Sequence, residues 1–256
     1  MKRLFFIPDT HIPYQDQRAV DVMLKALQAF SPDHVILLGD FVDFWPISAH
    51  VKDYKRRPSL KEELVATDAA LDDISSCVKD SCEQTYISGN HENRLDRYLT
   101  SEKGVAFLRP LVEAGAVDFD RISVPVLLNL KEKGWNWVPY KEHVKLGKLH
   151  VTHDLGKAGH TAAADAEATF QSNAVIGHVH SINYTVRGNM QGKSHVGASF
   201  GWLGDRKHVD YMYKAKALRN WALGFGIGYQ EPNGTTHLQP VPLVEYKCIL
   251  EGKLIK

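Results

Sequence analysis

The first half of the chain alternates short apolar runs with longer segments whose apolar residues recur every three to four positions. In residues 16–30, for example, Val20, Leu24 and Leu27 fall on one face of a helix. The pattern predicts strands and helices in turn, at residues 3–7, 16–30, 34–40, 60–78 and 84–90, with further helices at 92–101 and 104–115. This order indicates an α/β fold with a parallel sheet, because parallel neighbours are joined by helical crossovers.

The second half of the chain has more strand patterns than helix patterns. A helix is predicted at 161–170, between apolar strands at 148–154 and 173–180. Beyond Ile182 successive strands are predicted, at 183–188, 194–202, 222–230 and 236–250. The chain shows no internal repeat, linker or low-complexity tract, so we expect a single domain over residues 1–256.

Composition excludes several function classes. The 256 residues are 44% hydrophobic and 24% charged, and a net charge of +1 creates no global field that would attract nucleic acid or an anionic membrane. The first apolar run is too short for a signal peptide, and no stretch approaches the roughly 18 apolar residues of a membrane span. Three cysteines do not describe a disulfide framework. We expect a cytoplasmic protein without membrane contact, and its oligomeric state is left open.

Five of the predicted strands end in side chains that can bind metal ions. Asp9 and His11 follow the first strand, and side chains two residues apart point the same way in an extended segment. The other four strands end in the same manner, which gives seven candidate metal ligands: Asp9, His11, Asp40, Asn90, His153, His178 and His180. The carboxyl ends of strands are where open α/β sheets bind their ligands.

The seven candidates offer nitrogen and oxygen donors but no thiolate. They are too many for one tetrahedral ion, and they suit two ions that share a carboxylate. Such a set favours transition metals over Ca or Mg. We therefore expect two divalent transition-metal ions as cofactors, with Mn as the first choice and Fe, Zn, Ni or Co as alternatives.

The motifs DTH, GDFVD, GNHE, a single His and GHVH, in this order, resemble those of the calcineurin-like metallophosphoesterases over residues 9–180. The resemblance implies an α/β fold of the metallophosphoesterase type, a sandwich of two mixed β-sheets flanked by helices. It also implies a dinuclear metal site at the carboxyl ends of the strands. Residues 182–256 would then mainly complete the second sheet.

The resemblance further implies a role for each motif residue. One ion would be held by Asp9, His11, Asp40 and His180, and the other by Asp40, Asn90, His153 and His178, so that Asp40 bridges them. His91 would give a proton to the leaving oxygen, which a histidine can do near neutral pH. Asp43 is expected to orient His91 as a carboxylate partner of its imidazole.

Two motifs depart from the family pattern. The fourth reads THDLG where many relatives have His-Gly, which leaves Asp154 without an assigned role. The second reads GDFVDFW and lacks the Arg-Gly that follows in the Ser/Thr protein phosphatases, so that subgroup is disfavoured.

Several residues are candidates for substrate contact. Arg94, close to the third motif, is expected either to bind a phosphate oxygen or to lie on a solvated helix face. His50, Arg56 and Arg57 follow the second motif in a segment that either faces the substrate or forms a solvated loop. The segment 205–221 mixes basic and aromatic residues, which suits a nucleic-acid contact or, more simply, an amphipathic helix with a solvated basic face.

The expected function is a phosphoesterase in which metal-activated hydroxide attacks phosphorus. The expected partner is a phosphoester substrate, and we favour a phosphodiester in a nucleotide or nucleic acid. A diester carries one negative charge, which two cations and one fixed arginine neutralise with charge to spare. The alternatives are a phosphomonoesterase and, in another class, a non-catalytic scaffold with the metallophosphoesterase fold.

Overall fold

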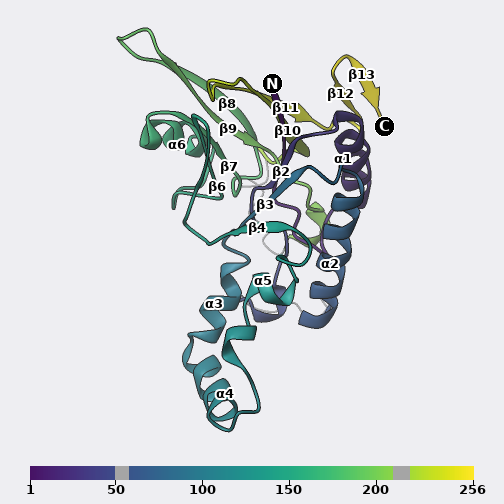
Figure 1. Cartoon of the computed structure of the whole chain (residues 1–256), viewed down its shortest axis with the longest axis vertical. Coiled ribbons are helices and arrows are strands. Elements are labelled where there is room, and N and C mark those ends of the chain that lie inside the picture. The colour runs from purple at the N-terminus through teal and green to yellow at the C-terminus, as the bar shows by residue number, and fades with distance from the viewer. Residues whose placement is uncertain (50–57, 210–219) are drawn as a thin grey trace.

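Two mixed sheets face each other in the computed structural model, with helices on their outer sides (Figure 1). The structure describes residues 1–49, 58–209 and 220–256. This arrangement confirms the predicted sandwich of two mixed sheets flanked by helices.

The first sheet has six strands, and its centre is parallel. Its spatial order is β11 (Thr236–Pro242), β10 (Gly224–Gln230), β1 (Lys2–Ile7), β2 (His34–Leu37), β3 (Glu83–Ile87) and β4 (Trp135–Val138). Strands β1 to β4 run parallel, whereas β10 pairs antiparallel with β1, and β11 pairs antiparallel with β10. The parallel order therefore places the carboxyl ends of β1, β2 and β3 side by side.

The second sheet has five strands. Its order is β5 (Val144–Leu146), β6 (Leu149–Thr152), β7 (Asn173–Ile176), β9 (Ser194–Phe200) and β8 (Ile182–Gly188), with β6, β7 and β9 parallel. Strands β12 (Cys248–Leu250) and β13 (Lys253–Ile255) form a separate hairpin. The expectation that 182–256 mainly completes the second sheet thus needs a correction, because β10 and β11 join the first sheet instead.

The helices form where the sequence supplies periodic apolar faces and caps. They are α1 (Gln17–Phe30), α2 (Leu60–Ser76), α3 (Asn93–Leu99), α4 (Glu102–Glu113), α5 (Val124–Leu127) and α6 (Ala162–Phe170), with 3-10 turns η1 (Trp45–Ile47), η2 (Phe119–Arg121) and η3 (Arg206–His208). At the start of α2, Ser59 and Glu62 form a capping box, in which each side chain bonds to the other residue's backbone N–H.

The core explains why β1 is apolar throughout. Successive side chains of a strand point to opposite faces, so Phe5 and Ile7 pack toward α1, whereas Leu4 and Phe6 pack toward the second sheet. Strand β2 alternates in the same way. Because both faces are covered, these strands read as continuous apolar runs rather than as polar–apolar alternation.

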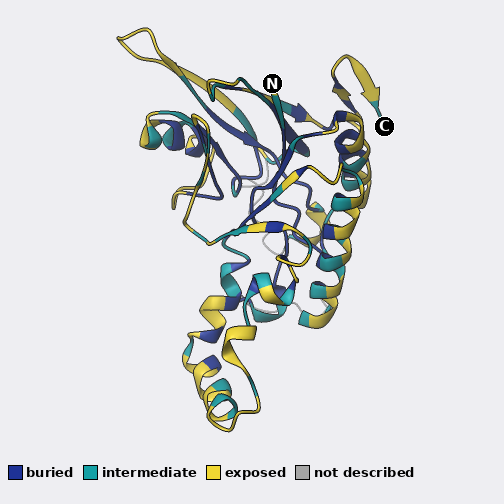
Figure 2. Ribbon diagram, in the orientation of Figure 1, coloured by how far each residue is buried: buried dark blue, intermediate teal, exposed yellow. Residues whose placement is uncertain are grey.

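The part of the chain around α3 and α4 projects from the body of the molecule. Figure 2 shows α4 as mostly exposed, in contrast to the buried strands at the centre. No helix in the described part of the chain is both long and apolar enough to cross a membrane.

Candidate active site

The loops that follow five strands meet at one edge of the sandwich. Strands β1, β2 and β3 of the first sheet lead to Asp9, Asp40 and Asn90, and the parallel strands β6 and β7 of the second sheet lead to His153 and His178. The candidate ligands that the sequence places at strand ends therefore lie at one edge of the sandwich, and their role as metal ligands stays a prediction.

The predicted ligands form two clusters of donor atoms. Asp9, His11, Asp40 and His180 offer atoms that all lie within 4.8 Å of one another, and Asp40, His153 and His178 form a second such group. The Asn90 side-chain oxygen, 3.1 Å from His153 Nε2, lies beside the second group. Asp40 belongs to both groups, which is the placement that a bridging ligand requires.

The donor atoms of the first cluster have the character of a cation site. His11 Nε2 and His180 Nε2 lie 3.0 Å apart, and His180 Nε2 lies 3.2 Å from Asp9 Oδ2. Asp9 is fully buried, yet its Oδ2 atom accepts no hydrogen bond. A buried carboxylate oxygen is costly without a partner, and a bound cation would supply one. The N/O donor set therefore fits the divalent transition-metal ions expected from the sequence.

Four of the candidate ligands have backbones in the left-handed region. The φ angles are 54° at His11, 49° at Asp40, 66° at His178 and 54° at His180. Such conformations are uncommon in non-glycine residues and cost of order 1–3 kcal/mol each. The extended geometry expected for Asp9 and His11 is therefore replaced by a tight turn, which still brings both side chains into one cluster.

Two glycines allow the loops to approach so closely. Gly39 has φ +92°, and a Cβ atom there would lie 2.5 Å from His153 Nδ1. A Cβ atom at Gly89 would lie 2.2 Å from the Asp40 carboxylate. Both positions therefore require glycine, in one case for conformation as well as space.

The imidazoles of the site differ strongly in their proton affinity. Burial, with a contribution from His91, lowers the pKa of His11 to about 4. Burial also acts to lower the pKa of His153, but Asp40, whose Oδ1 lies 3.4 Å away, and Asp9 outweigh it and raise this pKa to about 10. Since only a neutral imidazole binds a metal ion, metal loading must displace a proton from His153.

His91, Asp43 and Arg94 form a third group beside the two clusters. His11 Nδ1 and His91 Nδ1 each lie 3.3 Å from Asp43 Oδ2, so that Asp43 faces a candidate ligand and the candidate acid together. Arg94 donates to the Asp43 carbonyl at 2.8 Å and lies 3.3 Å from its carboxylate. The predicted orienting role of Asp43 is consistent with these contacts.

The hydrogen bonds of His91 indicate a neutral ring with its proton on Nδ1. Its Nδ1 lies 3.0 Å from the Asp43 carbonyl, and its Nε2 lies 3.0 Å from Arg94 Nη2, a group that can only donate. Burial acts to lower the pKa of His91, but the charges of Asp40 and Asp43 overcome it and raise the pKa above its usual value. The two carboxylates therefore favour the protonated form of His91, whose Nε2 proton would need the place that Arg94 Nη2 occupies.

Comparison with known proteins agrees with this geometry. The family model for calcineurin-like phosphoesterases matches residues 2–229. The chain belongs to the calcineurin-like phosphoesterase family. The Gene 54 protein of Mycobacterium phage L5 is 26% identical over 269 residues, covering 99% of this chain and 98% of the phage protein.

The solved structures that resemble the chain are more distant in sequence. A single mutant of Vps29 from Entamoeba histolytica has a TM-score of 0.44 and 14% identity, covering 98% of this chain and 95% of that chain. YfcE, a phosphoesterase from E. coli, has a TM-score of 0.39 and 12% identity, covering 93% and 98%.

In this calcineurin-like phosphoesterase, Glu92 is a structural centre of the site that the sequence analysis did not assign. Its buried carboxylate accepts backbone N–H groups from Asp40, Phe41, Val42 and Gly89, at 2.7–3.2 Å, and the Tyr86 hydroxyl at 2.7 Å. One side chain thus holds the loops after β2 and β3 together. Glu92 precedes α3, but its side chain makes no hydrogen bond to that helix, so the capping pattern of a helix start gave no signal for this role.

Glu63, on α2, is a second buried carboxylate near the site. It is 0% exposed, and neither carboxylate oxygen is hydrogen-bonded. Burial and the nearby charge of Asp43 raise its pKa to about 8, and the Trp45 backbone and Arg94 offset only part of this effect. Burial thus favours the protonated form of Glu63 in the folded chain.

This raised pKa predicts a pH-dependent effect of Glu63→Gln on stability. A group that holds its proton more tightly when folded stabilises the fold below its unfolded pKa of 4.5, and this stabilisation is lost as pH rises toward about 8. Between pH 5 and pH 8, the free energy of unfolding should fall more in the parent chain than in Glu63→Gln. The difference should be at least about 2 kcal/mol, since one pKa unit corresponds to about 1.4 kcal/mol.

Chemical denaturation of the metal-free chain, in chelator at both pH values, measures this difference. Asp73→Asn is the matched control, because Asp73 is an exposed carboxylate on the same helix. Equal pH dependence in the parent chain, Glu63→Gln and the control would show that Glu63 is ionised at neutral pH.

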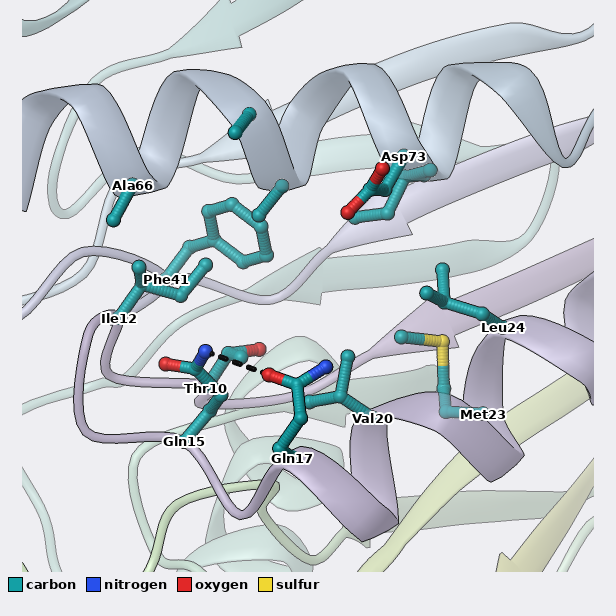
Figure 3. Close-up of a pocket in the computed structure, with 13 residues that line it drawn as sticks. Thr10, Ile12, Gln15, Gln17, Val20, Met23, Leu24, Phe41, Ala66 and Asp73 are labelled. Atoms are coloured by element: carbon teal, nitrogen blue, oxygen red, sulfur yellow. Dashed lines mark hydrogen bonds between the residues drawn. The ribbon is translucent and has the colours of Figure 1, made fainter.

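A cleft separate from the metal-binding clusters lies between α1 and α2. It has a volume of about 110 Å³, and its lining contains none of the candidate metal ligands. Figure 3 shows mainly apolar side chains there, including Val20, Met23 and Phe41, with Gln15 and Gln17 hydrogen-bonded to each other at one side. The chemistry of the site is thus not located in this cleft.

Three predicted substrate contacts, His50, Arg56 and Arg57, lie outside the described residues. Of the segment 205–221, η3 is described, whereas 210–219 is also outside. The unassigned Asp154 has a local role, because its Oδ1 accepts the Gly156 N–H at 2.7 Å and so shapes the turn after His153.

Proposed function

We propose that this calcineurin-like phosphoesterase hydrolyses phosphodiesters with the help of two divalent metal ions. The observation that carries the proposal is the convergence of the two donor clusters with His91, whose Nε2 lies 3.7 Å from Asp40 Oδ2. A candidate proton donor beside the shared carboxylate supports catalysis over a purely structural metal site.

The metal ions would be held as the donor clusters suggest. Asp9, His11, Asp40 and His180 would hold one ion, and Asp40, Asn90, His153 and His178 the other. When bound, the ions supply Lewis-acid polarisation of the phosphoester and activation of water. Mn is our first choice of metal, and Fe, Zn, Ni and Co have the same ligand preferences.

His91, Asp43 and Arg94, the third group, would have separate roles in proton transfer and phosphate binding. Asp43 orients the His91 ring and favours its protonated form, since the charge of Asp43 acts to raise the pKa of His91. Arg94, on turning from His91 Nε2 to a phosphate oxygen, would free that nitrogen to carry the proton for the leaving oxygen. Substrate binding and loading of the acid are thereby coupled through one guanidinium.

The charge around the site favours a diester over a monoester. Among the described residues, Arg94 is the arginine hydrogen-bonded to the Asp43–His91 pair, and Asp43 already neutralises part of its charge. A monoester dianion would gain from several fixed cationic donors around its terminal oxygens. A diester carries one negative charge and needs open space on both of its substituents.

The test is hydrolysis of bis-p-nitrophenyl phosphate and p-nitrophenyl phosphate by the chain loaded with Mn. We expect turnover of the diester, and we expect it to vanish when a chelator removes the metal. Turnover of the monoester alone would instead identify a phosphomonoesterase. Turnover of neither, with two metal ions bound, would support a non-catalytic scaffold.

A further inference from the structure

Two tryptophan rings adjoin the cluster formed by Asp9, His11, Asp40 and His180. The Trp202 ring is stacked on the His180 ring, with centroids 5.0 Å apart and an interplanar angle of 13°. The Trp221 ring meets His180 edge-on at 4.3 Å and Trp202 at 4.8 Å. The Nδ1 atom of the candidate ligand His153 is hydrogen-bonded to the Leu38 carbonyl, whereas His180 Nδ1 has no hydrogen-bond partner. The His180 ring is instead held by its contacts with the two tryptophan rings.

The two tryptophans differ in their access to solvent. Trp202 is 3% exposed and has one face against His180, so it supports the site from within. Trp221 is only partly buried and lies at the boundary between the cluster and the surface. Of the two rings, Trp221 is therefore the one that a bound molecule could contact from the solvent side.

A basic turn lies next to Trp221. In η3 the side chains of Arg206 and Lys207 are exposed, and Arg206 donates a hydrogen bond to the Trp221 carbonyl. The residue before this turn, Asp205, donates its N–H to the Tyr14 carbonyl at 2.8 Å, which ties η3 to the loop that carries His11. The basic turn, through Arg206, and the loop that carries His11 thus lie next to Trp221 and the candidate metal site.

We propose that Trp221 forms a stacking subsite for the nucleobase of a nucleotide substrate, with Arg206 and Lys207 facing its anionic backbone. The inference rests on the proposed diesterase function and names the substrate class for it. A ring beside cations matches a ligand that is both aromatic and anionic. Stacking of a base on an aromatic side chain contributes about 1–3 kcal/mol and tolerates any base.

Two diesters with the same leaving group test the subsite. One is the p-nitrophenyl ester of thymidine 5′-monophosphate, and the other is ethyl p-nitrophenyl phosphate, which has no ring on the retained side. Trp221→Ala should lower the ratio of kcat/KM for the thymidine ester to that for the ethyl ester by at least about fivefold, mainly through KM. Trp221→Phe should keep most of the ratio, and Trp221→Leu, which keeps bulk without a π-face, should lose it.

A ratio that stays constant while both substrates slow equally would overturn the inference, because Trp221 would then act only by holding His180. Tyr184→Ala is the matched control, since Tyr184 is 45% exposed on β8 and is part of neither the metal clusters nor the Trp221 surface. Its ratio should equal that of the parent chain.

A binding measurement separates this inference from the proposed function. Calorimetric titration of the Mn-loaded chain should show tighter binding of thymidine 5′-monophosphate than of methyl phosphate, and Trp221→Ala should remove at least fivefold of that preference. If the parent chain hydrolyses no diester but shows this preference, the subsite stands and the proposed activity fails. If it hydrolyses diesters but binds both ligands equally, the activity stands and the subsite is refuted.

Discussion

Replacing Asp40 with Asn is expected to reduce phosphodiester turnover by roughly 10³-fold or more. Asp40 supplies donor atoms to both clusters, and an amide oxygen can serve one cation but cannot bridge two as a carboxylate does. Metal ions contribute several kcal/mol of transition-state stabilisation, and each 1.36 kcal/mol corresponds to a factor of ten in rate. Steady-state kinetics with saturating Mn measures the loss.

The same substitution should lower metal content from two ions per chain to one or fewer, measured by elemental analysis after gel filtration. The fold should survive, because Asn can still accept the His91 N–H that Asp40 Oδ1 accepts at 2.8 Å. Asp33→Asn is the control, since Asp33 precedes β2 at the opposite end of the same strand and forms an ion pair with Lys79. Two ions and full turnover in Asp40→Asn would refute the bridging role.

The candidate ligands could be found from the sequence because of where they stand. Each follows an apolar strand, and parallel strands in one sheet bring their carboxyl ends to one edge. The sequence correctly predicted that the Asp9 and His11 side chains lie close together, but the extended backbone assumed for them is not the one observed. Their convergence depends on the left-handed backbone of His11, which no periodicity encodes, because the surrounding contacts impose it.

The sequence pattern could not identify residues whose roles depend on contacts with residues far away in the sequence. Glu63 lies on a helix whose sequence predicts only that helix, and its burial beside Asp43 depends on how α2 packs against η1. Trp202 and Trp221 are nineteen positions apart. Both rings contact His180 because Ala222, next to Trp221, accepts the Trp202 N–H and donates its own N–H to the His180 carbonyl.

The sheet assignment of the C-terminal strands had the same limit. The pattern identifies 222–230 and 236–250 as strands, but the apolar periodicity of a strand does not identify the strand that pairs with it. Strand β10 pairs with β1 from the first residues of the chain, a contact between segments more than two hundred residues apart. Such a pairing is decided by packing of the whole molecule.

His91→Ala is expected to slow the hydrolysis of diesters with alkyl leaving groups by roughly 10²–10⁴-fold, the usual contribution of general acid catalysis. The leaving alkoxide needs a proton, and His91 is the candidate donor beside the shared carboxylate. Esters of p-nitrophenol should slow much less, because that leaving group departs as a stable anion. Metal content should stay at two ions per chain, since His91 belongs to neither predicted ligand set.

The pH profile gives this prediction a second, independent measurement. Burial acts to lower the pKa of His91, but Asp40 and Asp43 raise it above its ordinary value, so the protonated acid extends to higher pH than in a free imidazole and is lost as pH rises through that pKa. In the parent chain, kcat for an alkyl diester should therefore fall on the alkaline side, and His91→Ala should lack this fall. If His91 is the general acid, its loss must slow the hydrolysis of esters with poor leaving groups more than that of esters with good leaving groups. Equal slowing of both substrate classes, with an unchanged pH profile, would show that His91 only shapes the site and that the leaving oxygen takes its proton from water.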